Sequence, residues 1–497
     1  MDYFFQKVFH KINSEYHIGY DPLLFSKGDI DRITDKYIKS NRYIIMVPID
    51  DNLIDKIWNR NKNFKTKKPF FIDEKCSTGD QNKKIITLLS KFSTDYLFIT
   101  SPQSICWLLN IRGNDLIYTP LIMAYCLINQ KGHLEIFSKL QNFVNNCHNL
   151  SFYSFEQIKD RILSINNQNK SIQFDYSKTP IWFYHNLNKK NIVNNDDPCL
   201  LLKSIKNKSE ITGFKYSMIQ DGIALTKLIF WLQKNIRDNI KVTETSIDKK
   251  LSFFKKKNSL FKTKSFETIS AYAQNSALIH YNPYCGNNLN ITTNSFYLLD
   301  CGSQYTCGTT DITRTFYFGT PTNAQRLHYT LVLKGLINLS SLFFPKKTSG
   351  SQVDVLARQF LWNQLLDYPH STGHGVGHYS SVHEGPQGIS KFNYQELCAN
   401  MIITIEPGYY IPGKYGIRLE NMVIIKEVEK NKNFLQFQTL TLAPIEYNLI
   451  DTNLLTLQEK KWLLLYHEKI LLKLSSFLTK YEVTYLNNYI NFYKNLL

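Results

Sequence analysis

The chain has 497 residues with a formal net charge of +18, and 43% of its residues are hydrophobic. Charged residues interrupt every apolar stretch before it reaches the ~18 residues that cross a bilayer, and the N-terminal MDYFFQKVFHKINSEYH lacks the apolar core of a signal peptide. We therefore expect a cytoplasmic protein without a membrane partner. Its nine Cys form no CxxC pair, and its Lys and Arg are spread along the whole chain, which argues against a disulfide framework and against a nucleic-acid partner.

The N-terminal part of the sequence predicts two domains. We expect a shortened first domain over residues 1–76, with a strand at 43–48 (YIIMVP). Residues 77–196 follow as a middle domain. Helical segments alternate there with strands at 95–100 and 124–128, which is typical of an α/β fold.

Residues 197–497 contain every candidate for chemistry and are predicted to form the catalytic domain, with a C-terminal extension from about residue 445. A helix is predicted at 209–236, because Ile and Leu recur there at about 3.6-residue spacing. Strands and turns dominate from residue 266 to residue 425. The chain as a whole is therefore predicted to belong to the α+β class.

Two Asp residues lie at the turn end of a predicted hairpin. The strand at 294–300 ends in Asp300, the strand at 310–317 begins beside Asp311, and glycines between them supply the turn. Two carboxylates held side by side repel each other, so a buried pair implies a shared proton or a metal. The alternative is a surface hairpin with solvated Asp side chains.

Two Glu residues follow in the same region. Glu406 comes directly after an apolar strand at 401–405 and before Pro and Gly, so its carboxylate is predicted to lie where the strand breaks. In a predicted strand at 416–425, the two-residue period places Arg418 and Glu420 on one face, where Arg418 is able to support a carboxylate. An exposed polar face with a simple Arg–Glu pair is the alternative.

Four of the twelve His residues crowd the segment HSTGHGVGHYSSVHEGP at 370–386. Its glycines predict an open segment that other backbone approaches closely. The spacing lacks the Glu of the helical HExxH zinc motif. A single His is usually structural, but this concentration indicates a functional site.

These residues lie in six longer segments: FETISAYAQNSALIHY (266–281), LLDCGSQYTCGTTDITRTFYFG (298–319), HSTGHGVGHYSSVHEGP (370–386), TIEPGYY (404–410), GIRLENMVI (416–424) and TLTLAPI (439–445). In them the chain closely resembles the metallopeptidases with the pita-bread fold, specifically the aminopeptidase P (Xaa-Pro aminopeptidase) family. HIGYDP (17–22) and WLLNIRGND (107–115) extend the resemblance over nearly the entire chain.

The resemblance implies a C-terminal pita-bread (creatinase/aminopeptidase-like) catalytic domain, preceded by an α/β creatinase-type N-terminal domain and a truncated first domain. It implies two divalent ions, usually manganese, and five ligands for them: Asp300, Asp311, His374, Glu406 and Glu420. Asp311 and Glu420 are expected to bridge both ions, and Glu406 to accept a proton. The histidines that surround the scissile bond in the family match His280, His370 and His383, and the residues that support its ligands match Tyr410 and Arg418.

The implied activity is release of the N-terminal residue from peptides with Pro at the second position, by attack of a hydroxide held by the two ions. A homodimer is expected from the same resemblance. Prolidase, which cleaves Xaa-Pro dipeptides on the same catalytic fold, is the main alternative. A non-catalytic binding protein and a metal-free creatine hydrolase are two others, and both are disfavoured by the intact set of ligands.

Overall fold

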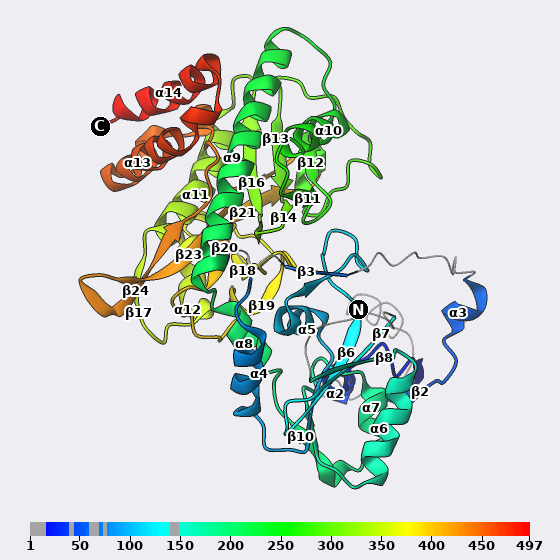
Figure 1. The fold of residues 1–497 in the computed structure, drawn as a ribbon. Coiled ribbons are helices and arrows are strands. Elements are labelled where there is room, and N and C mark those ends of the chain that lie inside the picture. Colours follow the sequence, from blue (N-terminus) through cyan, green and yellow to red (C-terminus); the bar gives the residue numbers. More distant parts are fainter. Residues whose placement is uncertain (1–15, 39–43, 59–68, 73–76, 140–148) are drawn as a thin grey trace. The chain divides into compact units, whose positions relative to one another are not determined.

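The computed structural model describes residues 16–38, 44–58, 69–72, 77–139 and 149–497 (Figure 1). The chain divides into two compact units. The N-terminal unit comprises Met1–Phe70, Asp80–Asp115 and Leu121–Leu200, and the C-terminal unit comprises Phe71–Gly79, Leu116–Pro120 and Leu201–Leu497. The boundaries expected from sequence between three domains stay a prediction.

The part of the chain up to residue 200 alternates strands and helices, as expected for its middle portion: β1 (Tyr16–Tyr20), α2 (Lys27–Ile38), β2 (Ile44–Pro48), α3 (Leu53–Ile57), β3 (Phe70–Phe71), α4 (Gln81–Leu89), β4 (Tyr96–Ile99), α5 (Pro102–Leu109), β5 (Ile111–Arg112), β6 (Ala124–Asn129), β7 (Leu134–Ser138), β8 (Leu150–Ser154), α6 (Gln157–Asn167), β9 (Ile172–Phe174), α7 (Ile181–His185), the 3₁₀ turn η2 (Lys189–Asn191) and β10 (Ile192–Asn194). The strands predicted at 95–100 and 124–128 are confirmed as β4 and β6. The strand predicted at 43–48 is confirmed from Ile44, and residue 43 lies outside the described residues.

A six-stranded sheet with the order β10-β9-β4-β6-β7-β8 forms the centre of the N-terminal unit. β4 runs parallel to β9 and antiparallel to β6. Ile158, Ile162 and Ile165 lie on one face of α6, and they pack with Phe98 and Leu127 of the sheet. This single helical stripe buries the helix against the strands.

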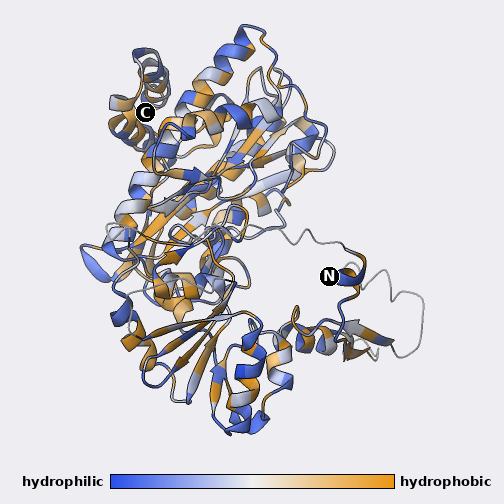
Figure 2. Ribbon diagram, turned by 45° about the vertical axis from the view of Figure 1, so that its right-hand side comes forward, coloured by the Kyte–Doolittle hydropathy of each residue, from blue (hydrophilic) through white to orange (hydrophobic). Residues whose placement is uncertain are grey.

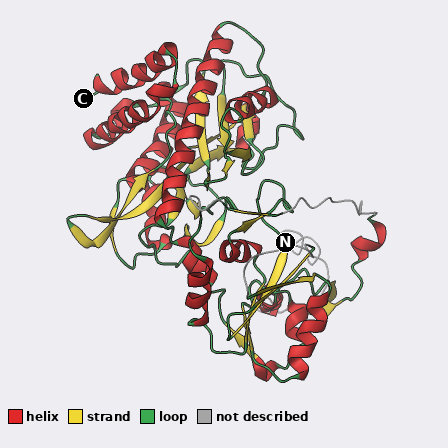
Figure 3. Ribbon diagram, in the orientation of Figure 1, coloured by secondary structure: helices red, strands yellow, loops and turns green. Residues whose placement is uncertain are grey.

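The C-terminal unit has long helices around several sheets (Figure 3), and its elements are α8 (Cys199–Ser204), α9 (Lys208–Arg237), α10 (Glu244–Lys255), β11 (Phe261–Thr263), β12 (Ile269–Tyr272), η3 (Ala273–Ala277), β13 (Phe296–Cys301), β14 (Gln304–Tyr305), β15 (Gly308–Thr309), β16 (Ile312–Tyr317), α11 (Asn323–Ser340), β17 (Phe343–Pro345), α12 (Gly350–Trp362), β18 (Gly373–Gly375), β19 (Glu384–Ile389), β20 (Ile402–Ile405), β21 (Gly408–Ile411), β22 (Tyr415–Arg418), β23 (Asn421–Val428), β24 (Asn431–Thr439), η4 (Tyr447–Leu449), η5 (Thr452–Leu454), α13 (Leu457–Leu474), η6 (Ser475–Phe477) and α14 (Lys480–Lys494). The helix predicted at 209–236 is confirmed as α9, which begins with a capping box between Asn207 and Glu210.

The largest sheet of this unit has the order β17-β24-β23-β20-β18-β19, and β12, β13 and β16 form another sheet. Side chains alternate between the two faces of β20 and β23. Ile402 and Ile424 belong to a core that includes α9, whereas Ile403 and Ile425 belong to a core that includes α11 and α13. Helices thus cover both faces of the sheet that positions the candidate site.

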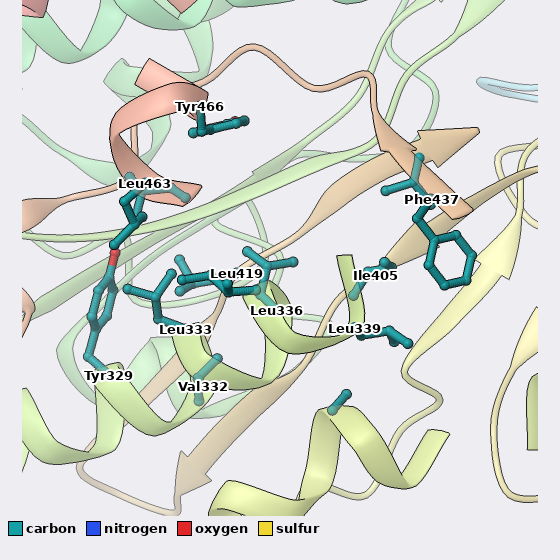
Figure 4. Close-up of a cluster of buried hydrophobic side chains, with 14 of the residues drawn as sticks. Tyr329, Val332, Leu333, Leu336, Leu339, Ile405, Leu419, Phe437, Leu463 and Tyr466 are labelled. Atoms are coloured by element: carbon teal, nitrogen blue, oxygen red, sulfur yellow. The ribbon is translucent and has the colours of Figure 1, made fainter. Parts of the chain in front are cut away.

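The core beside α11 shows how this packing is achieved. Figure 4 shows Leu333, Leu336 and Leu339 of α11 beside Leu419 and Ile405, and all five side chains are buried. In Figure 2 the hydrophobic residues follow the strands, whereas the helices carry both hydrophobic and hydrophilic residues. Within the described residues, none of the helices combines the length and the apolar character that spanning a bilayer requires.

Two strand predictions need correction. The predicted pairing of 294–300 with 310–317 is confirmed as β13 with β16, and carboxylate oxygens of Asp300 and Asp311 lie within 4.8 Å of each other, but a short β14–β15 hairpin is inserted at the turn. The strand predicted at 416–425 is divided into β22 and β23. The break lies at Glu420, whose N–H bonds to the carbonyl of Thr313 instead of joining the strand pairing of its neighbours. Arg418 and Glu420 are both buried, so the exposed polar face considered as an alternative is wrong.

Candidate metal centre

The five predicted metal ligands come from different strands and the residues next to them, and they are brought together by the fold. Together with His383, they form three overlapping groups whose ligand atoms lie within 4.8 Å of one another: Asp311, His374 and His383; His374, Glu406 and Glu420; and Asp300, Asp311 and Glu420. Asp300 lies in β13, Asp311 immediately precedes β16, and His374 is the central residue of β18. Glu406 follows β20, and Glu420 lies between β22 and β23.

His374 is oriented so that one ring nitrogen faces carboxylates. Its Nδ1 lies 2.9 Å from the carbonyl oxygen of Gly375, which only accepts, so Nδ1 carries a hydrogen. Its Nε2 lies 3.4 Å from Oδ2 of Asp311 and 3.6 Å from Oε1 of Glu406. Because Nδ1 is committed to the carbonyl of Gly375, Nε2 is the ring nitrogen available to bind a cation held by these two carboxyl groups.

A close approach of backbone to backbone fixes β18 beside β20. A Cβ atom on Gly373 would lie 1.9 Å from the carbonyl oxygen of Thr404, so only glycine fits there. The N–H of His374 donates to Oγ1 of the same threonine at 3.1 Å. The close approach predicted from the glycines of this segment is thus confirmed for Gly373.

Burial and mutual repulsion shift the pKa values of the carboxyl groups. Burial, followed by Asp300 and Glu406, raises the pKa of Asp311 well above its usual range. Burial, followed by Asp311, raises the pKa of Glu420 well above its usual range. Burial, followed by Glu420, raises the pKa of Glu406 to about 8. Among the described residues, Oδ1 of Asp300 has no hydrogen-bond partner. This donor set of carboxylate oxygens and one imidazole nitrogen suits divalent cations, which would offset the repulsion.

Arg418 and Tyr410 connect Asp300 to His370. Arg418 donates from Nη2 to Oδ2 of Asp300 at 2.6 Å and from Nη1 to the hydroxyl of Tyr410 at 2.7 Å. The hydroxyl of Tyr410 lies 2.9 Å from Nε2 of His370, whose Nδ1 lies 2.8 Å from the carbonyl of Ser371. Burial, then Arg418, lower the pKa of His370 to about 4, so the ring is neutral near pH 7 and its Nε2 accepts from Tyr410.

Thr313 and Arg314 also hold the ligand strands, and sequence reasoning missed both. Oγ1 of Thr313 donates to Oε2 of Glu420 at 2.9 Å. The guanidinium of Arg314 is buried and donates to the carbonyl oxygens of Glu420 (2.7 Å) and Ala443 (2.9 Å), and to the hydroxyl of Tyr466 (2.8 Å). The available signal was their position two and three residues after Asp311, in the strand that this residue precedes.

The segment that carries His383 is held by buried ion pairs, which were also missed. Glu384 is buried and forms ion pairs with Lys203 at 3.2 Å and with Lys206. Nζ of Lys203 also donates to the carbonyl oxygen of Gly385 at 2.9 Å. Because each group is paired, these charges fix the backbone on the C-terminal side of His383.

A cavity of about 510 Å³ lies over the five candidate ligands. Its walls include His280, His370 and His383, so the structure brings all three predicted histidines to one space. The ring centroids of His383 and His374 are 4.2 Å apart. Phe266 and Ile279 contribute apolar wall, which suits a peptide more than a small ion.

Three family models match the sequence. The metallopeptidase family M24 matches residues 213–427, the creatinase/prolidase N-terminal domain matches residues 61–210, and the C-terminal region of peptidase M24 matches residues 433–491. These matches confirm the predicted fold class, in which a creatinase-type N-terminal domain precedes the pita-bread catalytic domain.

Relatives of known name agree. A probable Xaa-Pro aminopeptidase P of Laccaria bicolor is 35% identical over 490 residues, which cover 95% of this chain and 76% of that protein. Xaa-Pro aminopeptidase 1 of Dictyostelium discoideum is 34% identical over 484 residues, which cover 92% of this chain and 76% of the relative.

A solved structure extends this similarity to the whole fold. The X-prolyl aminopeptidase of Caenorhabditis elegans, described as a cytosolic enzyme with a di-nuclear active site, superposes with a TM-score of 0.90 and 30% identity. The match covers 98% of this chain and 82% of that chain. The chain therefore belongs to the Xaa-Pro aminopeptidases of the metallopeptidase family M24, and its activity is that of a metalloexopeptidase.

Proposed function

We propose that the candidate centre holds two divalent ions and cleaves the first peptide bond of chains whose second residue is Pro. The proposal rests chiefly on one observation: Nε2 of a His374 ring whose hydrogen is on Nδ1 faces the carboxylates of Asp311 and Glu406. The di-nuclear active site of the Caenorhabditis elegans enzyme supports the number of ions. The proposed ligands are the five predicted residues: Asp300, Asp311, His374, Glu406 and Glu420.

Asp311 and Glu420 are the proposed bridging ligands. This role follows the family resemblance, and the two residues lie together, with ligand atoms within 4.8 Å of each other, in the group that contains Asp300. When bound, the ions lower the pKa of a water molecule toward neutrality and polarise the carbonyl of the scissile bond. We propose Mn²⁺, as the family resemblance implies, although ligands of this kind select metals by geometry and availability as much as by affinity.

Glu406 is the proposed general base and acid. Its carboxylate takes a proton as the oxygen of water bonds to the carbonyl carbon of the first residue. The same proton then passes to the proline nitrogen as the C–N bond breaks, so that a free amino acid and a shortened peptide leave. His280 and His383 line the cavity and are proposed to donate hydrogen bonds to the oxygen of the attacked carbonyl.

Tyr410 and Arg418 are proposed to support this chemistry without touching the substrate. Arg418 fixes one oxygen of Asp300, and Tyr410 fixes the neutral ring of His370, which faces the cavity. The bond preceding Pro is a tertiary amide without an N–H, so recognition of that residue has to come from shape and apolar contact. Phe266 and Ile279 provide such a surface in the cavity wall.

We also propose that the enzyme is a cytosolic homodimer. The location follows the likeness to the Caenorhabditis elegans enzyme, which is described as cytosolic. The dimer follows the family resemblance alone. Size-exclusion chromatography with light scattering at micromolar concentration is expected to give twice the mass of one chain, and a monomer would contradict it.

Activity of metal-stripped and Mn²⁺-restored protein tests the main proposal. Release of the first residue from Arg-Pro-Pro and longer Xaa-Pro peptides is expected to require the ion and to disappear in Asp311→Ala. An Xaa-Pro dipeptide and a peptide with Ala at the second position serve as controls. Cleavage of the dipeptide alone would indicate a prolidase, and Mn²⁺ binding without any cleavage would indicate a binding protein.

A further inference from the structure

Glu244, the first residue of α10, is a fully buried carboxylate that the reaction scheme does not use. It forms no ion pair with any residue that the structure describes. A carboxylate without a cation is costly to bury unless hydrogen-bond donors satisfy both oxygens. The hydrogen-bond donors that satisfy the carboxylate of Glu244 therefore indicate which part of the structure it stabilises.

All the side-chain hydrogen bonds of Glu244 come from one stretch of chain, residues 272–289. Oε1 accepts from the N–H of Tyr272 at 2.6 Å and from Nδ2 of Asn275 at 2.9 Å. Oε2 accepts from the hydroxyl of Tyr281 at 2.8 Å and from the N–H of Leu289 at 2.8 Å. Two oxygens thus gather four donor groups, two of them backbone amides that have no capacity to accept.

The same stretch forms one wall of the cavity. It contributes Ile279, His280, Tyr281 and Asn282, and between β12 and β13 its one helical element is the short 3₁₀ turn η3. A sheet or a long helix fixes its own backbone through repeated hydrogen bonds, and this stretch has no such ladder. The carboxylate of Glu244 supplies much of that framework from outside the segment, beside a bond from the N–H of Gly416 to Oγ of Ser276 at 2.8 Å.

Tyr281 transmits this constraint to its neighbour His280. Its hydroxyl donates to Glu244, accepts from Nδ2 of Asn275 at 2.9 Å and accepts from the N–H of Asn288 at 3.3 Å. The ring of Tyr281 is buried, whereas His280 next to it is exposed in the cavity. A tyrosine anchored at its far end therefore fixes the backbone from which His280 projects.

We propose that Glu244 is a positioning residue that holds His280 in place for catalysis by way of Tyr281. The inference rests on the proposed role of His280 at the scissile carbonyl. Misplacement of a substrate-facing group by about 1 Å costs up to about 100-fold in rate, so loss of this anchor is expected to act on kcat. The five metal ligands lie on other segments and are expected to keep their ions.

Glu244→Gln in the full-length, Mn²⁺-loaded enzyme tests the proposal. The amide keeps the size of the side chain but places an NH₂ group against donors that need an acceptor. With Arg-Pro-Pro as substrate, kcat is expected to fall roughly 10- to 100-fold with little change in KM or in bound Mn²⁺ per chain. Tyr281→Phe removes one hydrogen-bond donor to Glu244 and is expected to cause a smaller fall in kcat. This second variant tests the proposal if Glu244→Gln does not fold.

Glu482→Gln is the matched control, because Glu482 also lies in the first turn of a helix and does not line the cavity. It is expected to lower the melting temperature while kcat stays at the wild-type value. An unchanged kcat in both Glu244→Gln and Tyr281→Phe would overturn the proposal.

The His280→Ala background separates this inference from the proposed function. If Glu244 acts through His280, Glu244→Gln or Tyr281→Phe lowers kcat no further once His280 is gone. An equal fall in both backgrounds, with His280→Ala itself impaired, would overturn the positioning role alone. Wild-type kcat in His280→Ala would instead overturn the proposed role of His280, and with it the route by which Glu244 acts.

Discussion

Nη2 of Arg418 donates a 2.6 Å hydrogen bond to Oδ2 of Asp300, and both side chains are buried. The other terminal nitrogen of the same guanidinium is occupied by the hydroxyl of Tyr410 at 2.7 Å. One oxygen of Asp300 is therefore fixed by the protein, while Oδ1 has no partner among the described residues. Oδ1 is therefore available to bind a metal ion, and the orientation of the carboxylate depends on Arg418.

Arg418→Lys is expected to lower the affinity for Mn²⁺ by roughly 10- to 100-fold, as loss of a group that orients a ligand does. A single ammonium group lacks the planar fork that reaches Asp300 and Tyr410 together. Calorimetric titration of metal-free protein with Mn²⁺ measures the change. Arg237→Lys is the control, because the Arg237 side chain is 75% exposed. Equal affinities in wild type and Arg418→Lys would contradict the supporting role.

Asp311→Asn is expected to stabilise the metal-free protein while abolishing stabilisation by Mn²⁺. Burial and neighbouring carboxylates raise the pKa of Asp311, so at pH 8 its charged form opposes folding when no cation is bound. A shift of one pKa unit corresponds to about 1.4 kcal/mol, and we expect a gain of at least this order. Thermal unfolding with EDTA or Mn²⁺ measures both effects. A metal-free variant less stable than metal-free wild type would argue against carboxylate repulsion in the centre.

Tyr410→Phe is expected to lower kcat about 10-fold and to leave the fold intact. The change removes the hydroxyl that joins Arg418 to Nε2 of His370, so the neutral imidazole loses the partner that orients it. Steady-state kinetics with an Xaa-Pro peptide measures the loss. Tyr409→Phe is the matched control at the adjacent position, and comparable losses in the two variants would show that the hydroxyl of Tyr410 has no special part.

Stability is expected to depend on pH through Glu446, which is far from the ligands in sequence and buried. Burial, partly offset by hydrogen bonds from backbone N–H groups, raises the pKa of Glu446 from 4.5 to about 7. The folded state then holds a proton that the unfolded state releases, so this stabilising contribution is complete below pH 4.5 and is lost as pH rises through 7.

Glu446→Gln is therefore expected to match wild type near pH 4.5 and to be more stable at pH 8, by an amount on the order of 3 kcal/mol. Melting temperatures across this range test the sign. The control Glu459→Gln removes a carboxylate that is paired with Lys334 at 2.7 Å, so it is expected to lose stability at pH 8. A Glu446→Gln variant that melts below wild type at pH 8 would show that the carboxyl group of Glu446 is charged in the folded protein at that pH.

Local sequence signals predicted most of the strands, whereas the full set of candidate ligands followed from the family resemblance. Asp300 lies near the end of an apolar strand, two residues before Gly302, and Glu406 directly follows another strand and precedes Pro407, so each is marked by its own neighbours. The break at Leu419 and Glu420 has no local mark, since it depends on bonds to Pro407 and Thr313. The catalytic and metal-binding roles of these residues stay predictions.

The supporting residues were harder to find for the same physical reason. Glu244 is 37 residues from Tyr281 and 45 from Leu289, and Glu384 is 178 from Lys206. The sequence does not distinguish a Glu that is buried from one that is exposed to solvent. Only the fold shows which hydrogen-bond donors surround a buried carboxylate. Capping boxes, by contrast, are short enough to be read directly, as at Asn207 and Glu210.

The guanidinium of Arg314 ties the candidate metal centre to α13, a helix that follows all five candidate ligands in the chain. It bonds to Ala443 and to Tyr466 of α13, as well as to Glu420 in the ligand segment. While α13 is still inside the ribosome, the guanidinium of Arg314, which is buried in the folded protein, lacks some of its hydrogen-bond acceptors. The strand that follows Asp311 then lacks the support that these bonds give. A nascent chain stalled before residue 466 is therefore expected to carry no peptidase activity.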